Sequence, residues 1–185
     1  MNSTISSSAF CALFAVLAAA GPAAAQHTHA HAPAAGVLQM PEPMRIEHEA
    51  IHAALEAATG VAGAVGEAAR DLARVLGPHF TRENQIALPP LALLEPLARG
   101  DAIPQDQAAA ALAMTDSLRA ELPRMLEEHV HIDAAAKKLE QVARAHGNKE
   151  PADLAHDLQV HAGTEQAVSY PAALLVGMML RHGQR

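Results

Sequence analysis

The chain has 185 residues, a formal net charge of −7 and one cysteine, Cys11. A net negative charge argues against a nucleic-acid partner, because such interfaces are positively charged. Cys11 lies in a segment that we predict to be removed. We therefore expect no disulfide, thiolate metal site, iron–sulfur cluster or cysteine nucleophile, and any metal would be held by nitrogen and oxygen ligands.

Residues 1–25 are typical of a secretory signal peptide. An apolar run over residues 9–20 is followed by Gly21, Pro22 and three alanines at 23–25, which favours export and cleavage over a membrane span. The run is not preceded by Lys or Arg, so an uncleaved anchor is the alternative. We predict a periplasmic or secreted protein with no membrane span in its mature chain.

Residues 26–41 are rich in Ala, Pro and His and lack a periodic apolar face, so we predict a flexible arm. Its histidines His27, His29 and His31 could capture Cu, Ni or Zn, or could serve only as a solubilising tail. Residues 42–185 are dominated by Ala and Leu and show no alternating pattern. This composition predicts one all-α domain.

Apolar periodicity and prolines predict four long helices and two shorter helical segments. The first begins near Pro43, ends at Gly60 and places Ile51, Leu55 and Ala58 inward. The other long helices are expected over residues 61–86, over residues 105–146 and from Pro151 onward. A short helix within residues 88–104 and a further turn or two over residues 172–181 complete an up-and-down four-helix bundle.

Two segments repeat one chemical pattern, a carboxylate four residues after an imidazole. His79 precedes Glu83, and His161 precedes Glu165. On a helix, side chains four residues apart point in nearly the same direction, with Cβ atoms about 5–6 Å apart. The histidine can then bind one metal while the glutamate bridges to a second. The pairs therefore indicate a di-metal site.

The other two long helices each offer a comparable pair, His48 with His52 and His129 with Asp133. Any one pair alone would be read as an ordinary surface pair. However, His79, His129 and His161 continue the apolar stripes of their helices, which predicts that they lie inside. Burying them with carboxylates would cost several kcal/mol for each unpaired ion. Two divalent cations would offset this cost.

Residues 45–181 resemble the hemerythrin-like, or HHE cation-binding, family. The resemblance rests on EHEAI at 47–51, HFTRE at 79–83, EEH at 127–129 and HAGTE at 161–165. It implies a di-iron centre with an oxo or hydroxo bridge. The implied terminal ligands are His48, His79, His129 and His161, and the implied bridging ligands are Glu83 and Glu165.

The chain departs from the oxygen-carrying members of that family at Asp133, where they place a second histidine. Asp133 would either ligate an iron, leave a position open on it or accept a hydrogen bond from a histidine. An open position or a carboxylate ligand favours reactivity over reversible O₂ binding. On the first helix, His52 could replace His48 as ligand, although we favour His48.

These expectations define a non-haem di-iron protein of the cell envelope that binds or reacts with O₂, peroxide or nitric oxide. An oxidoreductase or peroxidase-like activity would fit, but no enzyme class is assigned. One alternative is a periplasmic metal-binding, delivery or storage module without catalytic turnover. Another is a helical interaction protein without metal. Nitrogen and oxygen ligands also admit manganese or zinc.

The remaining notable side chains have simpler expectations. We expect Phe80 to pack beside the site, and Tyr170 either to pack or to donate a hydrogen bond to a metal-bound oxygen. The methionines Met114, Met125, Met178 and Met179 are predicted to fill the core. The histidines predicted to face solvent are His131, His146, His156 and His182.

Overall fold

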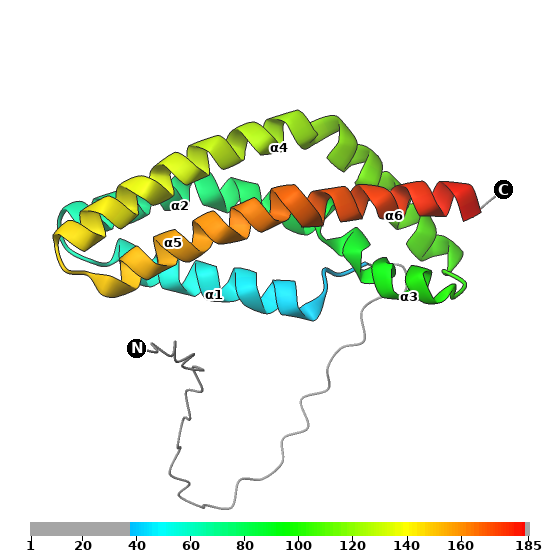
Figure 1. The fold of residues 1–185 in the computed structure, drawn as a ribbon, viewed down its shortest axis with the longest axis horizontal. Coiled ribbons are helices and arrows are strands. Elements are labelled where there is room, and N and C mark those ends of the chain that lie inside the picture. Colours follow the sequence, from blue (N-terminus) through cyan, green and yellow to red (C-terminus); the bar gives the residue numbers. More distant parts are fainter. Residues whose placement is uncertain (1–37, 184–185) are drawn as a thin grey trace, which may run out of the picture. The chain divides into compact units, whose positions relative to one another are not determined.

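A computed structural model describes residues 38–183 of the chain, and every regular element in that range is helical (Figure 1). The expected signal peptide at 1–25 and the histidines His27, His29 and His31 lie outside the described residues. Within them, the helix boundaries follow the prolines and glycines of the sequence closely. The predicted all-α architecture is confirmed for this part of the chain.

Four long helices form a bundle (Figure 1): α1 (Glu42–Thr59), α2 (Ala64–Arg82), α4 (Gln105–Ala145) and α5 (Lys149–Thr164). Helix α1 has proline in its first turn, where the missing N–H costs nothing, and Gly60 follows its last residue. Its buried face is His48, Ile51, Leu55 and Ala58, in steps of three and four residues. The predicted inner face of the first helix is therefore confirmed.

The connection between α2 and α4 is helical, as predicted. It comprises a π-helical turn η1 (Glu83–Ala87), a 3-10 turn η2 (Pro89–Leu93) and the short helix α3 (Leu94–Arg99). After α5 comes a second π-helical turn, η3 (Glu165–Ser169), and then α6 (Tyr170–Gly183). The last helical segment is therefore longer than the turn or two expected over residues 172–181.

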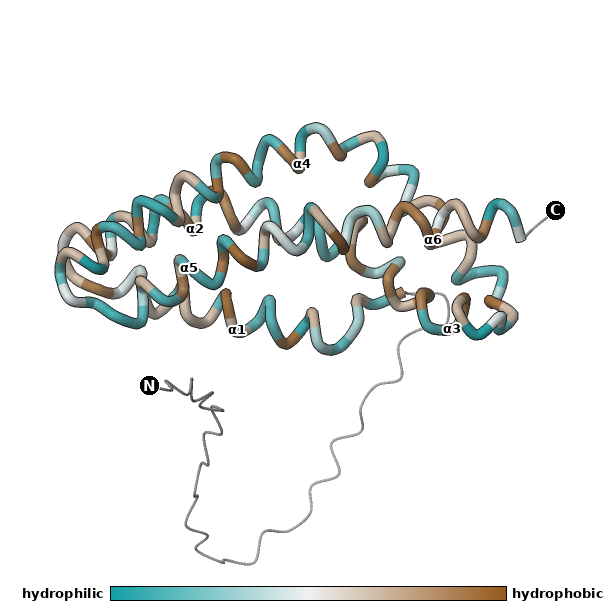
Figure 2. The backbone as a smooth tube through the Cα atoms, in the orientation of Figure 1, coloured by the Kyte–Doolittle hydropathy of each residue, from teal (hydrophilic) through white to brown (hydrophobic). Residues whose placement is uncertain are grey.

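The bundle core lies where α1, α2, α4 and α5 meet. Leu72, Leu139 and Leu158 are among its most deeply buried side chains, and each stabilises the fold by about 1.5–3 kcal/mol. Helix α4 is long enough to pack on α2 and α5 along one half and on α6 along the other. Figure 2 shows hydrophobic positions recurring at intervals along these helices, with hydrophilic positions between them.

Some predicted core positions are wrong. Met178 and Met179 are exposed, because α6 turns Ala173, Val176 and Leu180 toward the interior instead. Leu126, which belongs to the apolar stripe that was expected to lie inside with His129, is also exposed, since one residue rotates it about 100° away from the buried Met125. Met114 is only partly buried. The four histidines expected to face solvent are all exposed, namely His131, His146, His156 and His182.

Among the helices of residues 38–183, none combines the length and the hydropathy that a membrane crossing requires.

Candidate metal centre

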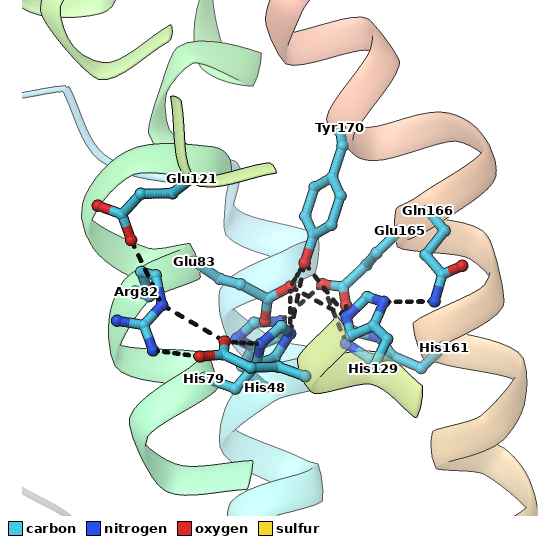
Figure 3. Close-up of polar contacts among 11 residues, drawn as sticks. His48, His79, Arg82, Glu83, Glu121, His129, His161, Glu165, Gln166 and Tyr170 are labelled. Carbon is cyan, nitrogen blue, oxygen red and sulfur yellow. Dashed lines mark hydrogen bonds and ion pairs between the residues drawn. The ribbon is translucent and has the colours of Figure 1, made fainter. Parts of the chain in front are cut away.

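All four long helices contribute a histidine to one buried cluster in the middle of the bundle (Figure 3). Two glutamates join them, each at the first residue of a π-helical turn. No member is more than 7 % exposed. The cluster consists of His48, His79, Glu83, His129, His161 and Glu165. These are the six residues that the sequence singled out, and the structure brings them together.

The cluster divides into two groups whose potential ligand atoms lie within 4.8 Å of one another. One group is His79, Glu83, His129 and Glu165, and the other is His48, His161 and Glu165. Imidazole nitrogens and carboxylate oxygens are suitable ligands for divalent transition metals. These buried groups could therefore hold a metal ion.

Glu165 belongs to both groups, and its two oxygens face different histidines. Its Oε1 lies 3.4 Å from Nε2 of His48 and 3.2 Å from Nε2 of His161. Its Oε2 lies 3.7 Å from Nε2 of His129. One carboxylate therefore spans the two groups, which is the arrangement that a bridging ligand requires.

Three of the histidines are oriented by partners at their other ring nitrogen. Nδ1 of His79 lies 2.9 Å from Glu128, and Nδ1 of His161 lies 3.0 Å from Glu47. Nδ1 of His129 lies 2.7 Å from the amide nitrogen of Gln166. A contact at Nδ1 fixes the plane of the ring and leaves Nε2 facing the centre of the cluster.

The sequence did not reveal these orienting partners. Glu47 and Glu128 stand next to histidines in the sequence, but each contacts a histidine on another helix. Glu128 is held in turn by Arg82, whose Nη2 lies 2.7 Å from Oε1. Such contacts depend on how helices pack, which no local spacing encodes.

The two glutamates differ in their electrostatic environment. Burial raises the pKa of Glu83, and the neighbouring charge of Glu165 raises it further, against the effect of His79. Burial would also raise the pKa of Glu165, but its close contacts with the imidazoles of His161 and His48 hold that pKa well below its usual range. Glu165 is therefore the more strongly anionic of the two.

The pKa values of the histidines also differ from one another. Burial would lower the pKa of His161, but its close contacts with the carboxylates of Glu165 and Glu47 outweigh it and raise that pKa to about 9. Burial and the positive charge of His79 lower the pKa of His129 to about 4. At neutral pH and without a metal, His161 is therefore a cationic imidazolium, whereas His129 is a neutral imidazole.

Four buried polar atoms of the cluster have no hydrogen-bond partner among the described residues. They are His48 Nδ1, Glu83 Oε2, His161 Nε2 and Glu165 Oε2. A buried polar atom without a partner costs about 1–3 kcal/mol. Three of the four are atoms that a metal ion would bind, so the donor set fits a cation at both groups.

Tyr170 reaches the cluster from the first position of α6. It is 1 % exposed, and its hydroxyl donates to Oε1 of Glu83 and lies 3.2 Å from Nε2 of His129. The π-helical turn explains this position, because the backbone N–H of Tyr170 bonds to the carbonyl of Glu165, five residues back. In an α-helix five residues rotate by about 140°, which would have turned Tyr170 away.

Phe80 packs beside the site as predicted. It is 7 % exposed, and its ring stacks on that of His48 with centroids 4.2 Å apart. This contact fixes the His48 ring from one side, since nothing among the described residues bonds to its Nδ1.

The two less certain ligands, Asp133 and His52, lie outside both groups. Asp133 pairs with Lys137 at 2.6 Å, and its side chain is 41 % exposed. Although Asp133 follows His129 by four residues, its carboxylate is directed to Lys137 at the surface and belongs to neither group. His52 is exposed, one turn from the buried His48. The geometry does not support ligation by either residue.

The chain matches no protein-family model, no curated protein and no solved structure.

Proposed function

We propose that the chain is a hemerythrin-like protein that holds two iron ions and binds or reacts with O₂, peroxide or nitric oxide. The observation that carries this proposal is the position of Glu165, whose two oxygens face separate histidines. A site for a single metal ion would need only one of the two ligand groups, whereas a pair of ions explains why both groups share Glu165. The family resemblance of the four motifs agrees with it.

In this proposal the two groups divide the ligands unequally. His79, His129 and Glu83 would hold one iron, and His48 and His161 would hold the other. Glu165 would bridge the pair. The irons would supply the redox chemistry, while the chain fixes the ring planes through Glu47, Glu128 and Gln166.

The ligand set also suits a small reactant. Each iron would receive few protein ligands, so coordination positions would remain for an exogenous molecule. The cluster is almost fully buried, which excludes a large substrate from direct contact. Tyr170 places a hydroxyl next to His79, His129 and Glu83, where its single O–H would turn from Glu83 to donate to a small oxygen-containing ligand.

The test is anaerobic reconstitution of metal-stripped protein with ferrous iron, followed by metal analysis. We expect about two irons per chain, and charge-transfer bands of an iron pair after exposure to O₂. Glu165→Ala should lose at least one iron per chain. Asp133→Ala is the matched control and should keep both. One iron per chain in the natural protein, or two in Glu165→Ala, would contradict the proposal.

Competition with manganese and zinc tests the identity of the metal, because nitrogen and oxygen ligands do not select iron by affinity alone. Nitric oxide and peroxide, added separately to the reduced iron form, should each change the spectrum. If the spectrum of the reconstituted protein responds to none of O₂, nitric oxide and peroxide, the metal centre would stand and the proposed reactivity would be contradicted.

A further inference from the structure

A groove of about 870 Å³ runs between α1 and α5 and reaches the cluster. Its outer end is lined by Glu150 and Asp153, at the start of α5, and by Ala54 on α1. Its inner end is lined by His161 and Glu165. Both of these inner residues are members of the candidate metal centre.

Carboxylates line the groove along one face of α5. Glu150, Asp153 and Asp157 precede His161 and Glu165 in steps of three and four residues, so successive side chains lie about 5–6 Å apart. On α1, Glu47 stands at the inner end. Its side chain is 54 % exposed, yet it lies 3.0 Å from Nδ1 of His161. The row therefore connects solvent with a predicted ligand.

The charged side chains that line the groove between α1 and α5 are mainly carboxylates, so the groove is negatively charged. Among the described residues that line it there is no Lys or Arg, although Lys149, outside the lining, pairs with Asp153. The facing wall on α1 is formed by Ala50, Ile51 and Ala54. A cleft with acidic groups along a low-dielectric wall concentrates cations and speeds their arrival by about 10- to 1,000-fold.

The inner end carries acceptors that point to a cation. Glu165 is 2 % exposed and its Oε2 has no hydrogen-bond partner among the described residues. His161 is 7 % exposed, and its Nε2 makes no well-aligned hydrogen bond within that part of the chain, although it lies 3.2 Å from Oε1 of Glu165. The acidic row thus ends at two buried atoms that would both bind a divalent metal.

A second groove, of about 740 Å³, lies between α1 and α2, and its described lining residues likewise include no Lys or Arg. It reaches His48, but the Phe80 ring covers one face of that imidazole. Of its carboxylates, Glu49 is paired with Arg45 at 2.5 Å. Neither glutamate of the cluster lines it. It therefore provides a natural comparison for the groove between α1 and α5.

We infer that the groove between α1 and α5 is the route by which divalent cations reach the metal centre. Glu150 and Asp157 attract the cation, and Glu47 passes it to His161 and Glu165. The inference rests on the proposed metal binding. It assigns to Glu150, Asp157 and Glu47, none of which is a proposed ligand, a role in delivering the metal ion to the centre.

The experiment measures how fast metal-stripped protein takes up Co²⁺, followed by the visible absorption of the bound ion in a stopped-flow instrument. The variant Glu150→Gln/Asp157→Asn removes two charges from the groove. The control, Glu49→Gln/Glu56→Gln, removes two charges from the groove between α1 and α2 and so changes the net charge equally. All four side chains are exposed.

At about 20 mM salt we expect Glu150→Gln/Asp157→Asn to slow uptake about 5- to 10-fold, and the control to change it less than about 2-fold. At about 0.5 M salt the three proteins should converge, because exposed charges are then screened. The amount of Co²⁺ bound at equilibrium should be the same in all three. Asp157→Lys should slow uptake further.

Equal uptake rates in the two double variants would overturn the inference. So would a rate for the natural protein that does not change with salt, a measurement that needs no variant to fold. Failure of the proposed metal binding would look different, because the natural protein would then bind no Co²⁺ at any salt concentration, whereas failure of the di-iron assignment would appear in the iron stoichiometry.

Discussion

The backbone N–H of Tyr170 bonds to the carbonyl of Glu165, and this hydrogen bond returns Tyr170 to the face of the helix that Glu165 occupies. The same turn recurs in the other half of the chain, where the N–H of Leu88 bonds to the carbonyl of Glu83 at 3.0 Å. In both cases the glutamate is the first residue of the π-helical turn. Such turns are often found at functional sites.

Tyr170→Phe should lower the free energy of unfolding of the metal-free protein by about 1–3 kcal/mol, because it removes the hydrogen-bond donor to the buried Glu83 carboxylate. Chemical denaturation measures this directly. In a Glu83→Gln background the same substitution should cost less, since the charged acceptor is gone. Equal costs in the two backgrounds would show that the hydroxyl and Glu83 are not coupled.

Glu128→Gln and Glu47→Gln should each weaken metal binding by about 10- to 100-fold, because these carboxylates orient His79 and His161 through Nδ1. The number of metals bound at saturation should not change. Glu127→Gln is the matched control for the first variant, since Glu127 is exposed. Competitive titration against a chelator measures the affinities. An affinity loss in Glu127→Gln of equal size would point to surface charge instead.

The sequence could predict five of the six cluster residues because their signal is local, whereas His48 was assigned from the family resemblance. His79 with Glu83, and His161 with Glu165, share a helix, and the apolar stripes before them indicate burial. The orienting residues Glu47, Glu128 and Gln166 were missed, since each acts across a helix interface. The sequence pattern around Glu47 does not predict that α1 packs against α5.

Each π-helical turn has a signal in the sequence, a proline that follows it closely. Pro89 and Pro171 each stand six residues after a cluster glutamate. A proline has no N–H for the helix ladder, so it favours a change of hydrogen bonding in the turn before it, although Pro78 and Pro123 lie within continuous α-helices. A helix continued with regular α geometry would place Tyr170 on the wrong face. For this reason the sequence could not decide whether Tyr170 packs in the core or donates a hydrogen bond within the site.

Metal binding and the stability of the metal-free protein should respond to pH in opposite directions between about pH 7 and 9. The pKa of His161 is raised to about 9 in the fold, above its unfolded value of about 6.5. The folded state therefore holds a proton that the unfolded state loses, and stability falls as pH rises through this window. Metal binding must displace the same proton, so affinity rises.

Urea unfolding of the metal-free protein at several pH values, and metal titration over the same range, test both halves of this prediction. His161→Gln should flatten the stability curve, whereas His146→Gln, at an exposed position, should not. Calorimetry in buffers of different ionisation enthalpy should detect proton release on metal binding at pH 7.5. Metal-free stability that rises from pH 7 to 9 would contradict the assigned direction of the His161 pKa.

Leu139→Ala should destabilise the protein by about 2–5 kcal/mol, and Leu126→Ala by less than about 1 kcal/mol. Both residues lie on α4, but Leu139 is fully buried among α1, α2, α4 and α5, whereas Leu126 is 38 % exposed. The pair tests the orientation of α4, because a rotation that buried Leu126 would withdraw His129 from the cluster. Comparable losses in the two variants would therefore count against the described packing, and with it against the convergence of the four histidines.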